Sequence, residues 1–277
     1  MKTVTFSSLF RLTRNQSNYS TMKRHILIIA TAVIGMALAS CTLHIDNGSM
    51  SETIKGNGII VEREFEVTKF NELLCALPAT VNFTVSDDCT CKVRVDDNIL
   101  DRLDIKVDDG SLLLRKQMKT RGGLTLKATE FVIDVTAPSL EDINLAGSGD
   151  INIHSPLDEK ELHVNLAGSG NVVFKEEVNI DQLELGVASS GDISIEKGTV
   201  REIEAVIAGS GKIVSHAEVQ EMDASIAGSG DIIAKVNGTL EYSILGSGDI
   251  EYYGNAVVKG EKLGSGKVTQ IESPTKE

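Results

Sequence analysis

The stretch LAGSGDINI, from Leu145 to Ile153, recurs in modified form through the second half of the chain. Aligned on the serine, the later copies read LAGSGNVVF, VASSGDISI, IAGSGKIVS, IAGSGDIIA, ILGSGDIEY and LGSGKVTQ. Their spacings are 21, 21, 20, 19, 18 and 18 residues. Seven copies at this period predict a solenoid in which each copy contributes one coil. The serines are Ser148, Ser169, Ser190, Ser210, Ser229, Ser247 and Ser265.

Hydrophobic residues within each copy alternate with polar ones, which is the period of a β-strand with one buried face. Leu162, Val164 and Leu166 precede one serine, and Ile151 and Ile153 follow another. The pattern predicts an all-β fold, a parallel β-helix or solenoid whose coils of about 20 residues wind around a closed apolar lumen. A third, looser apolar position per coil is occupied by Leu157, Val178, Val200, Val219 and Val236.

The Gly-Ser-Gly corner is interpreted as a structural turn. Both glycines are expected to take positive φ, and the preceding alanine is expected to stack at a crowded inner corner. Equivalent residues in successive coils lie about 4.8 Å apart, so the seven serines are expected to form a hydrogen-bonded ladder. A catalytic serine is not indicated, because the nucleophile elbow has the pattern Gly-x-Ser-x-Gly. In the last copy Gly260 and Lys262 replace inward apolar residues, which predicts a terminal cap.

The N-terminal part of the chain carries targeting signals. Residues 1–21 are interpreted as lying upstream of the true initiator, Met22. Residues 22–40 contain a basic head, a short apolar run and the sequence Leu-Ala-Ser before Cys41, which resembles the lipobox of bacterial lipoproteins. We therefore expect a lipoprotein signal peptide at 22–40, lipidation of Cys41 and a flexible, lipid-anchored tether over 41–56. The alternative is an ordinary signal peptide with an incidental cysteine.

Residues 57–140 lack the repeat and predict an N-terminal cap rich in β-hairpins, which would cover the first coil and its sheet edges. One hairpin is expected between Val81–Val85 and Lys92–Val95. A second joins Asp104–Val107 to Ser111–Arg115 across an Asp-Gly turn. The expected organisation also includes a helical turn at 98–103, a strand at 131–136, the solenoid at 141–272 and a tail at 273–277.

The order of these features resembles the GIN-domain family of auto-transporter adhesin heads, which are envelope lipoproteins frequent in Bacteroidetes. The resemblance rests on GNGIIVEREFEVTKFNELLCALPATVNFTVSDD, then VDDNILDRLDIKVDDGSLLLRK, then the repeated AGSGDI, and covers about residues 56–272. It implies a parallel β-helical fold and a surface or periplasmic location, and it brings no catalytic residues. The chain differs from an auto-transporter because it ends at SPTKE without C-terminal barrel strands, so its anchor is expected to be lipid.

Charge and composition argue against several classes of function. The net charge is −13, and it becomes −18 once residues 1–41, with five bases and no acids, are set aside. Residues 141–277 alone carry 24 acids and 10 bases. A body this acidic argues against nucleic-acid partners. The near-minimal coils and the absence of Trp argue against a polysaccharide-active β-helix enzyme, and no catalytic or cofactor-binding residues are predicted.

The residue after each Gly-Ser-Gly forms a column of mostly charged side chains along the solenoid. Stacked carboxylates at a β-helix corner can bind Ca²⁺. However, two lysines interrupt the column, and the period is about twice that of the nine-residue calcium-binding repeat. We therefore predict a structural charge ladder and no metal site. The column consists of Asp150, Asn171, Asp192, Lys212, Asp231, Asp249 and Lys267.

The remaining cysteines and the histidines predict no chemistry. The cysteines lack histidines at zinc-ligand spacing, so they are interpreted as small buried hydrophobes or as one disulfide bridge with a third thiol. The histidines are expected at outward or loop positions without clustered partners. These residues are Cys75, Cys89, Cys91, His154, His163 and His216.

The sequence as a whole predicts a non-enzymatic, lipid-anchored outer-membrane protein of the cell envelope, facing the periplasm or the exterior. Its expected role is that of an adhesin or binding module for a protein or glycan ligand, with the membrane as a partner through the lipid at Cys41. A structural or self-assembling envelope scaffold, which would form homo-oligomers, is the alternative.

Overall fold

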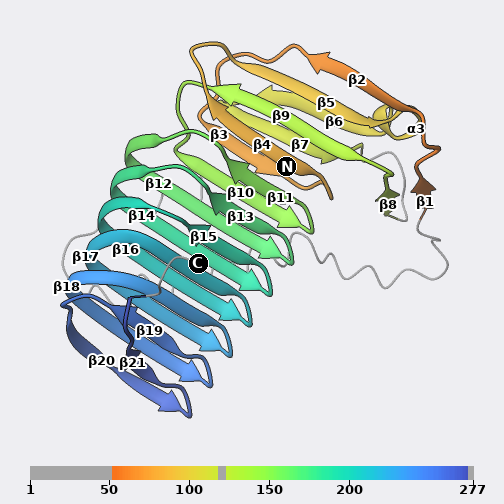
Figure 1. Cartoon of the computed structure of the whole chain (residues 1–277). Helices are drawn as coiled ribbons and strands as arrows, with labels where there is room; N and C mark the ends of the chain where they lie inside the picture. The colour runs from red at the N-terminus through yellow and green to blue at the C-terminus, as the bar shows by residue number, and fades with distance from the viewer. Residues whose placement is uncertain (1–51, 118–122, 274–277) are drawn as a thin grey trace, which may run out of the picture.

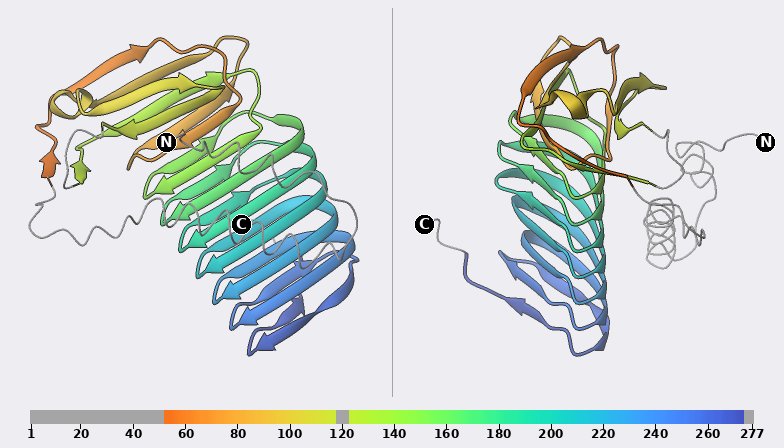
Figure 2. Two further views of the ribbon diagram at one scale, coloured as in Figure 1. Left: turned by 180° about the vertical axis from the view of Figure 1, so that it is seen from behind. Right: turned by 90° about the vertical axis from the view of Figure 1, so that its right-hand side faces the viewer.

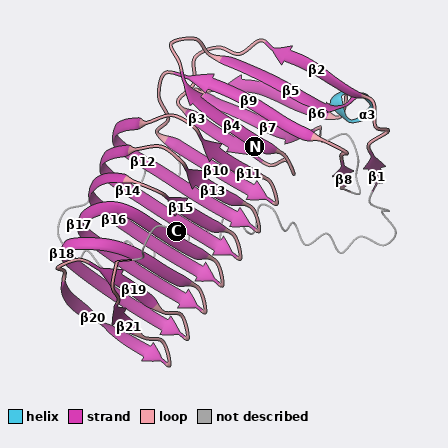
Figure 3. Ribbon diagram, viewed as in Figure 1, coloured by secondary structure: helices cyan, strands magenta, loops and turns pink. Residues whose placement is uncertain are grey.

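The computed structural model describes residues 52–117 and 123–273, and most of these residues lie in β-strands (Figures 1 and 3). The predicted signal peptide, Cys41 and most of the predicted tether lie outside the described residues. In the described part of the chain, no helix is long and apolar enough to cross a membrane. Because the described elements are strands apart from one helix of four residues, the fold is all-β, as the period of two in the sequence predicts.

The N-terminal region contains nine strands and one short helix within the described residues (Figure 1). The strands β2, β5, β6, β7 and β9 make antiparallel pairs, whereas β3 and β4 run parallel to their neighbours in the solenoid. The elements are β1 (Glu52–Lys55), β2 (Ile60–Phe65), β3 (Glu72–Cys75), β4 (Thr80–Val85), β5 (Thr90–Asp96), α3 (Asp97–Leu100), β6 (Leu103–Asp108), β7 (Ser111–Lys116), β8 (Leu124–Lys127) and β9 (Phe131–Ala137).

The repeat region is a parallel β-solenoid, which confirms the predicted fold class. Each coil contributes a long strand to one face and a short strand to another, and β17 and β18 run continuously through both. The long-strand face stacks β10, β12, β14, β16, β17, β18 and β20, and the short-strand face stacks β11, β13, β15, β17, β18, β19 and β21.

The bounds of the repeat strands follow the sequence period. They are β10 (Asp142–Gly147), β11 (Asp150–Ile153), β12 (Leu157–Gly168), β13 (Asn171–Phe174), β14 (Val178–Ser189), β15 (Asp192–Ile195), β16 (Gly198–Gly209), β17 (Lys212–Gly228), β18 (Asp231–Gly246), β19 (Ile250–Tyr253), β20 (Val257–Gly264) and β21 (Val268–Gln270). The views in Figure 2 show the coils stacked along one axis, with the N-terminal strands at one end and β20 and β21 at the other.

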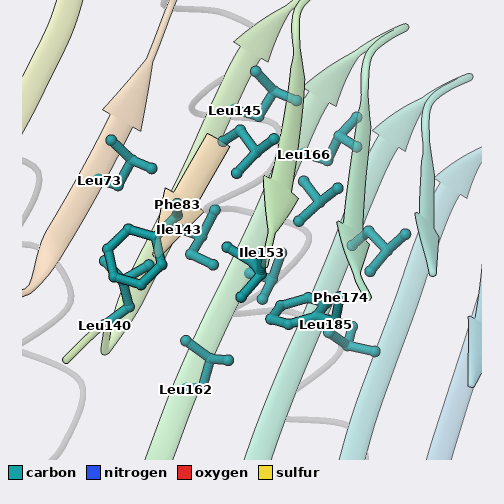
Figure 4. Close-up of a cluster of buried hydrophobic side chains, with 14 of the residues drawn as sticks. Leu73, Phe83, Leu140, Ile143, Leu145, Ile153, Leu162, Leu166, Phe174 and Leu185 are labelled. Atoms are coloured by element: carbon teal, nitrogen blue, oxygen red, sulfur yellow. The ribbon is translucent and has the colours of Figure 1, made fainter. Parts of the chain in front are cut away.

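The lumen of the solenoid is packed with aliphatic side chains (Figure 4). Leu145, Leu166 and Val187 are successive partners in the ladder, and each is at most 1 % exposed. Ile207, the next member of this column, is fully buried. Because each inward residue contacts its copies above and below, burial in one coil depends on the neighbouring coils.

Two inward columns of the lumen change in size along the chain. Large apolar residues in the early coils give way to alanine or serine, and the next residues along the two columns are Tyr242 and Tyr252. The two columns run Val164, Leu185, Ala205, Ala224 and Phe174, Ile195, Ser215, Ala234.

One predicted hairpin is wrong and the other is confirmed. The segments Val81–Val85 and Lys92–Val95 are not paired, because β9 lies between β4 and β5, parallel to the first and antiparallel to the second. The turn SDDCT therefore crosses over a strand that arrives much later in the sequence. The hairpin of β6 and β7 forms as expected, with positive φ at both Asp109 and Gly110.

Parallel stacking begins before the first Gly-Ser-Gly copy. Residues of β3 pair in register with β10, and residues of β4 pair with β11, so that Cys75 lies beside Leu145 and Phe83 beside Ile153. This coil turns through Leu-Pro-Ala instead of Gly-Ser-Gly, with the backbone of Ala79 accepting a hydrogen bond from the amide of Asp150 at 2.9 Å. The repeat pattern did not predict this coil because its corner has a different sequence.

Candidate binding faces of the solenoid

The first glycine of each corner is required by backbone conformation. At Gly147, Gly168 and Gly209, for example, φ lies between +136° and +147°, a region that side chains with a Cβ rarely occupy. The variant corner Ser189-Ser190-Gly191 places Ser189 at the same position with φ of +104°. Serine at this φ stores strain, so the third coil has the least favourable corner.

The second glycine is required for a different reason, which corrects the expectation of positive φ at both. None of the second glycines has positive φ. Instead, the coils approach so closely here that a Cβ at Gly170 would lie 1.8 Å from the carbonyl oxygen of Gly149. A Cβ at Gly211 would lie 2.2 Å from the carbonyl oxygen of Gly191. The second glycine is therefore required by close stacking alone. The first is required by its turn and also by stacking, since a Cβ at Gly168 would lie 2.0 Å from the carbonyl oxygen of Gly147.

The predicted serine ladder is formed by the backbone at most corners. The amide of Ser169 donates to the carbonyl of Gly147 at 2.9 Å, and the amide of Ser229 donates to Gly209 at 2.8 Å. A bond between hydroxyls joins Ser265 and Ser247 at 3.1 Å. All seven serines are exposed. Their side chains therefore line an outer edge of the solenoid.

The alanine before the corner faces outward, which corrects the predicted inner position. In β12 the inward residues are Leu162, Val164 and Leu166, so the pleat turns Ala167 to the opposite side. Ala188, Val206 and Ala208 form a small apolar cluster separate from the lumen. These residues therefore pack against one another on the outer side of the long strands.

The column after each corner binds its own backbone. A carboxylate oxygen of Asp192 accepts the amide of Lys212 at 2.8 Å, and one of Asp249 accepts the amide of Lys267 at 2.7 Å. Asp150 accepts both the amide and the side-chain nitrogen of Asn171, at 3.0 and 2.8 Å. Lys212 pairs in register between Asp192 and Asp231. In this column the carboxylates join successive coils.

No metal-binding group is formed by the described residues: over 52–117 and 123–273, no three His, Cys, Asp or Glu side chains are arranged to hold an ion. The cysteines form no disulfide in this part of the chain. Burial raises the pKa of the Cys75 thiol to about 11 and that of Cys91 to about 12. Because the thiolate is the reactive form, Cys75 and Cys91 behave as buried hydrophobes.

The long-strand face carries a row of acids that the sequence analysis missed. We call the sixth residue before each corner serine the acidic ridge, and these residues are neighbours in register through every coil. The row could have been found in the sequence, because each of its residues lies six positions before a corner serine. The acidic ridge consists of Asp142, His163, Glu184, Glu204, Asp223, Glu241 and Lys259.

Like charges meet at the centre of the acidic ridge. Glu204 lies between Glu184 and Asp223 in the ladder and is half-buried. Burial, followed by the charges of Glu184 and Asp223, raises the pKa of Glu204 to about 7. Near neutral pH this carboxyl group is therefore protonated in a substantial fraction of molecules.

His163 occupies the N-terminal part of the acidic ridge and has the clustered partners that the sequence analysis did not expect. Its ring nitrogens lie 3.4 Å from Asp142, 3.3 Å from Glu161 and 3.6 Å from Glu184. Burial alone would lower the pKa of His163, but the bond to Asp142 and the charge of Glu184 raise it to about 9. The imidazolium therefore neutralises part of the ridge at neutral pH.

The other two histidines have single partners. His154 lies 3.2 Å from the side-chain oxygen of Asn82, and His216 lies 2.8 Å from the hydroxyl of Tyr253. Neither pair includes an acid that would orient the imidazole as a general base. The described solenoid has two outward faces, one formed by the long strands and one by the short strands.

The comparisons place the chain in a family. A family model described as "putative auto-transporter adhesin, head GIN domain" matches residues 69–256, and the chain belongs to this family. The match covers the first parallel coil at β3 and β4 and most of the repeat. Among curated proteins, no sequence matches the chain significantly.

Solved structures share the fold over their whole length. A putative lipid binding protein from Parabacteroides distasonis is 26% identical with a TM-score of 0.70, and the match covers 80% of this chain and 100% of that one. A putative adhesin from the same species is 27% identical with a TM-score of 0.67, covering 79% and 100%. A putative adhesin from Bacteroides fragilis is 24% identical with a TM-score of 0.71, also covering 79% and 100%.

Proposed function

We propose that the protein is a lipid-anchored, non-enzymatic envelope adhesin that binds a protein or glycan ligand on the long-strand face of its solenoid. Family membership supports the adhesin role and an envelope location. The lipobox ending at Cys41 supports the anchor. The outward residues of the long strands are in register from coil to coil, so this face offers a ligand contacts across several coils.

The acidic ridge is the observation that carries this proposal. Like charges directly opposite one another destabilise a sheet, and Glu184, Glu204 and Asp223 are direct neighbours. In the column after each corner, Lys212 separates Asp192 from Asp231, and the adjacent acids Asp231 and Asp249 are joined by a hydrogen bond of 3.1 Å from the amide of Asp249 to a carboxylate oxygen of Asp231. A run of adjacent acids lowers the stability of the folded protein. Because this fold can place a lysine between acids elsewhere, such a run is typical of a functional surface.

An array experiment tests the ligand-binding role. The full chain is applied to glycan and protein arrays together with a ridge variant, Glu184→Gln/Asp223→Asn/Glu241→Gln. We expect wild-type binding that the ridge variant loses by about tenfold or more, as electrostatic contacts at an interface require. The matched control removes three exposed acids elsewhere, Glu177→Gln/Glu196→Gln/Glu272→Gln. Equal binding by both variants, or a blank array with wild type, would contradict the proposal.

The anchor and the location need separate measurements. Metabolic labelling with a clickable fatty acid should label wild type but not Cys41→Ser. Protease shaving of intact cells should degrade the solenoid if it faces the exterior and spare it if it faces the periplasm. Persistent labelling of Cys41→Ser would refute the lipidation site.

The lipid-binding description of the Parabacteroides distasonis relative adds one probe to the array. The inward side chains of the solenoid are buried against one another, so a lipid would have to lie on an outer face. Vesicles of zwitterionic lipid are the suitable probe, because the acidic surface repels anionic headgroups. The alternative function, a structural or self-assembling scaffold, predicts no ligand and large assemblies by light scattering.

A further inference from the structure

The last coil leaves one edge of the long-strand face without a partner strand in the described residues. Strand β20 pairs with β18 on one side only, so the backbone groups of its other edge are available. Nearly all of its residues are exposed, and they include Val257 at 59% and Leu263 at 73%. An exposed strand edge is a template for pairing with another strand.

The outward side chains of β20 are complementary to themselves in the antiparallel direction. In chain order they are Val257, Lys259, Glu261 and Leu263, which is apolar, basic, acidic, apolar. If Gly260 lies opposite Gly260 of a second copy, Lys259 faces Glu261 of that copy and Val257 faces its Leu263. Opposite charges and apolar side chains in direct cross-strand pairs stabilise a sheet, and each pair occurs twice.

Lys259 also marks the point where the acidic ridge changes sign. It is the partner of Glu241 in the ladder, and it has no ion pair of its own in the part of the chain that the structure describes. Lysine at an exposed edge usually discourages strand pairing. Here antiparallel approach of a second copy would place Glu261 of that copy opposite Lys259, on the side away from Glu241.

Continued parallel stacking is blocked at this end. A Cβ at Gly260 would lie 2.1 Å from the carbonyl oxygen of Tyr242 and 2.7 Å from its ring atoms, so the last coil has no inward side chain at this position on which a further coil could pack. Lys262 stands at the inward column of Ile244 and donates to the carbonyl of Gly266 at 2.9 Å. At the other end of the molecule the outermost strands, β2 and β6, belong to antiparallel pairs. A head-to-tail fibre of continuous parallel coils therefore has no matching pair of ends.

We propose that two copies of the chain join through antiparallel pairing of their β20 strands about Gly260, forming a closed two-fold dimer. An isologous contact uses the same edge in both copies, so it ends at two subunits. The dimer continues the long-strand face across the junction. It goes beyond the proposed ligand binding and does not depend on it.

Charge reversal tests the pairing, with the full chain studied by sedimentation velocity in mild detergent over a concentration series. Lys259→Glu places two carboxylates opposite each other at both contacts, and Glu261→Lys places two lysine pairs there. We expect each single variant to raise the dimer dissociation constant about tenfold or more, as two repulsive cross-strand pairs require. The double variant Lys259→Glu/Glu261→Lys restores both opposite pairs and should return the constant to within about threefold of wild type.

Cysteine cross-linking tests the register in the same preparation. The double variant Lys259→Cys/Glu261→Cys should form a covalent dimer on mild oxidation, and Lys259→Cys alone should form much less of it. Wild type, which has Cys75, Cys89 and Cys91, gives the background. Unchanged circular dichroism and melting show that the variants are folded. A monomeric wild type, or a double charge variant no better than the single ones, would overturn the proposal.

Discussion

The N-terminal cap and the solenoid are both all-β, but different interactions hold them together. In the solenoid, each strand pairs in register with its copy, and every coil repeats the same contacts. In the cap, strands distant in sequence meet once, as β9 does between β4 and β5. Repetition spreads stability over many equivalent contacts, whereas the cap depends on a few particular side chains.

Asp96 is the clearest such side chain in the cap. It is fully buried, and its two carboxylate oxygens accept the amides of Gly58 and Thr129, each at 2.7 Å. Gly56 packs so tightly against it that a Cβ would lie 2.3 Å from the carboxyl group. Asn57 donates to Asp97, so the GNG and VDDN motifs meet around one buried acid. The cap therefore depends on one carboxylate for stabilising contacts, whereas the solenoid spreads such contacts over its coils.

The largest effect is expected from breaking the solenoid at its lumen. Ile207→Asp places a charge in a fully buried column shared by adjacent coils, which should cost about 4 kcal/mol or more and unfold several coils together. Hydrogen exchange should show lost protection in the coils on both sides. The control, Ile233→Asp, alters an outward position of the short-strand face and should change melting only slightly. Equal melting of the two variants would refute the inward assignment.

A smaller and more local effect is expected in the cap. Asp96→Asn places an NH₂ group opposite one of two backbone donors, which should cost about 2–4 kcal/mol. Hydrogen exchange should quicken at Gly58 and Thr129 while the solenoid coils stay protected. The exposed Asp101→Asn is the matched control. If the solenoid lost protection as well, the two regions would form one cooperative unit.

The same carboxylate gives the cap an acid-sensitive contribution to stability. Burial alone would raise the pKa of Asp96, but the amide hydrogen bonds of Thr129 and Gly58 lower it below its usual value. Its contribution is therefore complete above the pKa of an unfolded aspartate and is lost as the pH falls through the native pKa. Lowering the pH should consequently unfold the cap of the wild-type protein, and the Asp96→Asn variant should not show this pH-dependent transition.

The contribution of the acidic ridge to folding stability should change with pH in the opposite direction. Between the ordinary glutamate pKa of 4.5 and the native value of about 7, the folded state binds more protons at Glu204, so stability falls as pH rises. Glu204→Gln should therefore raise the melting temperature by about 2–6 °C at pH 8, allowing for partial exposure, and by little at pH 5. Glu221→Gln, an exposed neighbour, is the control. A gain that is equal at both pH values would contradict the raised pKa.

His163 adds to the same trend. Its stabilising charge is complete below the ordinary histidine pKa of 6.5 and is lost as the pH rises through about 9. Glu204 and His163 therefore both make the solenoid less stable in alkali, whereas Asp96 makes the cap less stable in acid.

The smallest effect is expected at the variant corner. Ser189→Gly removes the backbone strain of a non-glycine residue at φ of +104°. After the entropic cost of glycine is subtracted, the substitution should stabilise the protein by about 1 kcal/mol. Calorimetry should show a rise in melting temperature of about 2–4 °C. The matched control Ser194→Gly, in an ordinary strand position, should lower it. A loss at Ser189 would show that its side chain supports the corner.

The repeat region was predictable because its information is local and is given seven times. Alternation in residues such as Leu162 and Val164 defines the inward side, and the spacing defines the coil. The second glycine was misread because close approach to Gly149 is a contact between coils, which no single copy reveals. The acidic ridge was overlooked although its offset from the serine is constant.

The cap was less predictable because its pairing is long-range. A turn sequence such as Ser86–Cys89 indicates that the chain reverses, but not which strand will lie beside it. The arrival of β9 beside β4 depends on long-range pairing with β4 and β5 and on burial of Ile133 and Val135 in the core. Local propensity carries no signal for such a contact.

The stacking of coils along one axis also determines how the protein would respond to mechanical load. Force applied between an N-terminal anchor and the last coil would run along the hydrogen bonds that join successive coils, so they would open one coil at a time. A coil of about 20 residues spans about 66–72 Å when extended, against about 4.8 Å of rise in the stack. Each released coil would therefore lengthen the molecule by about 60 Å.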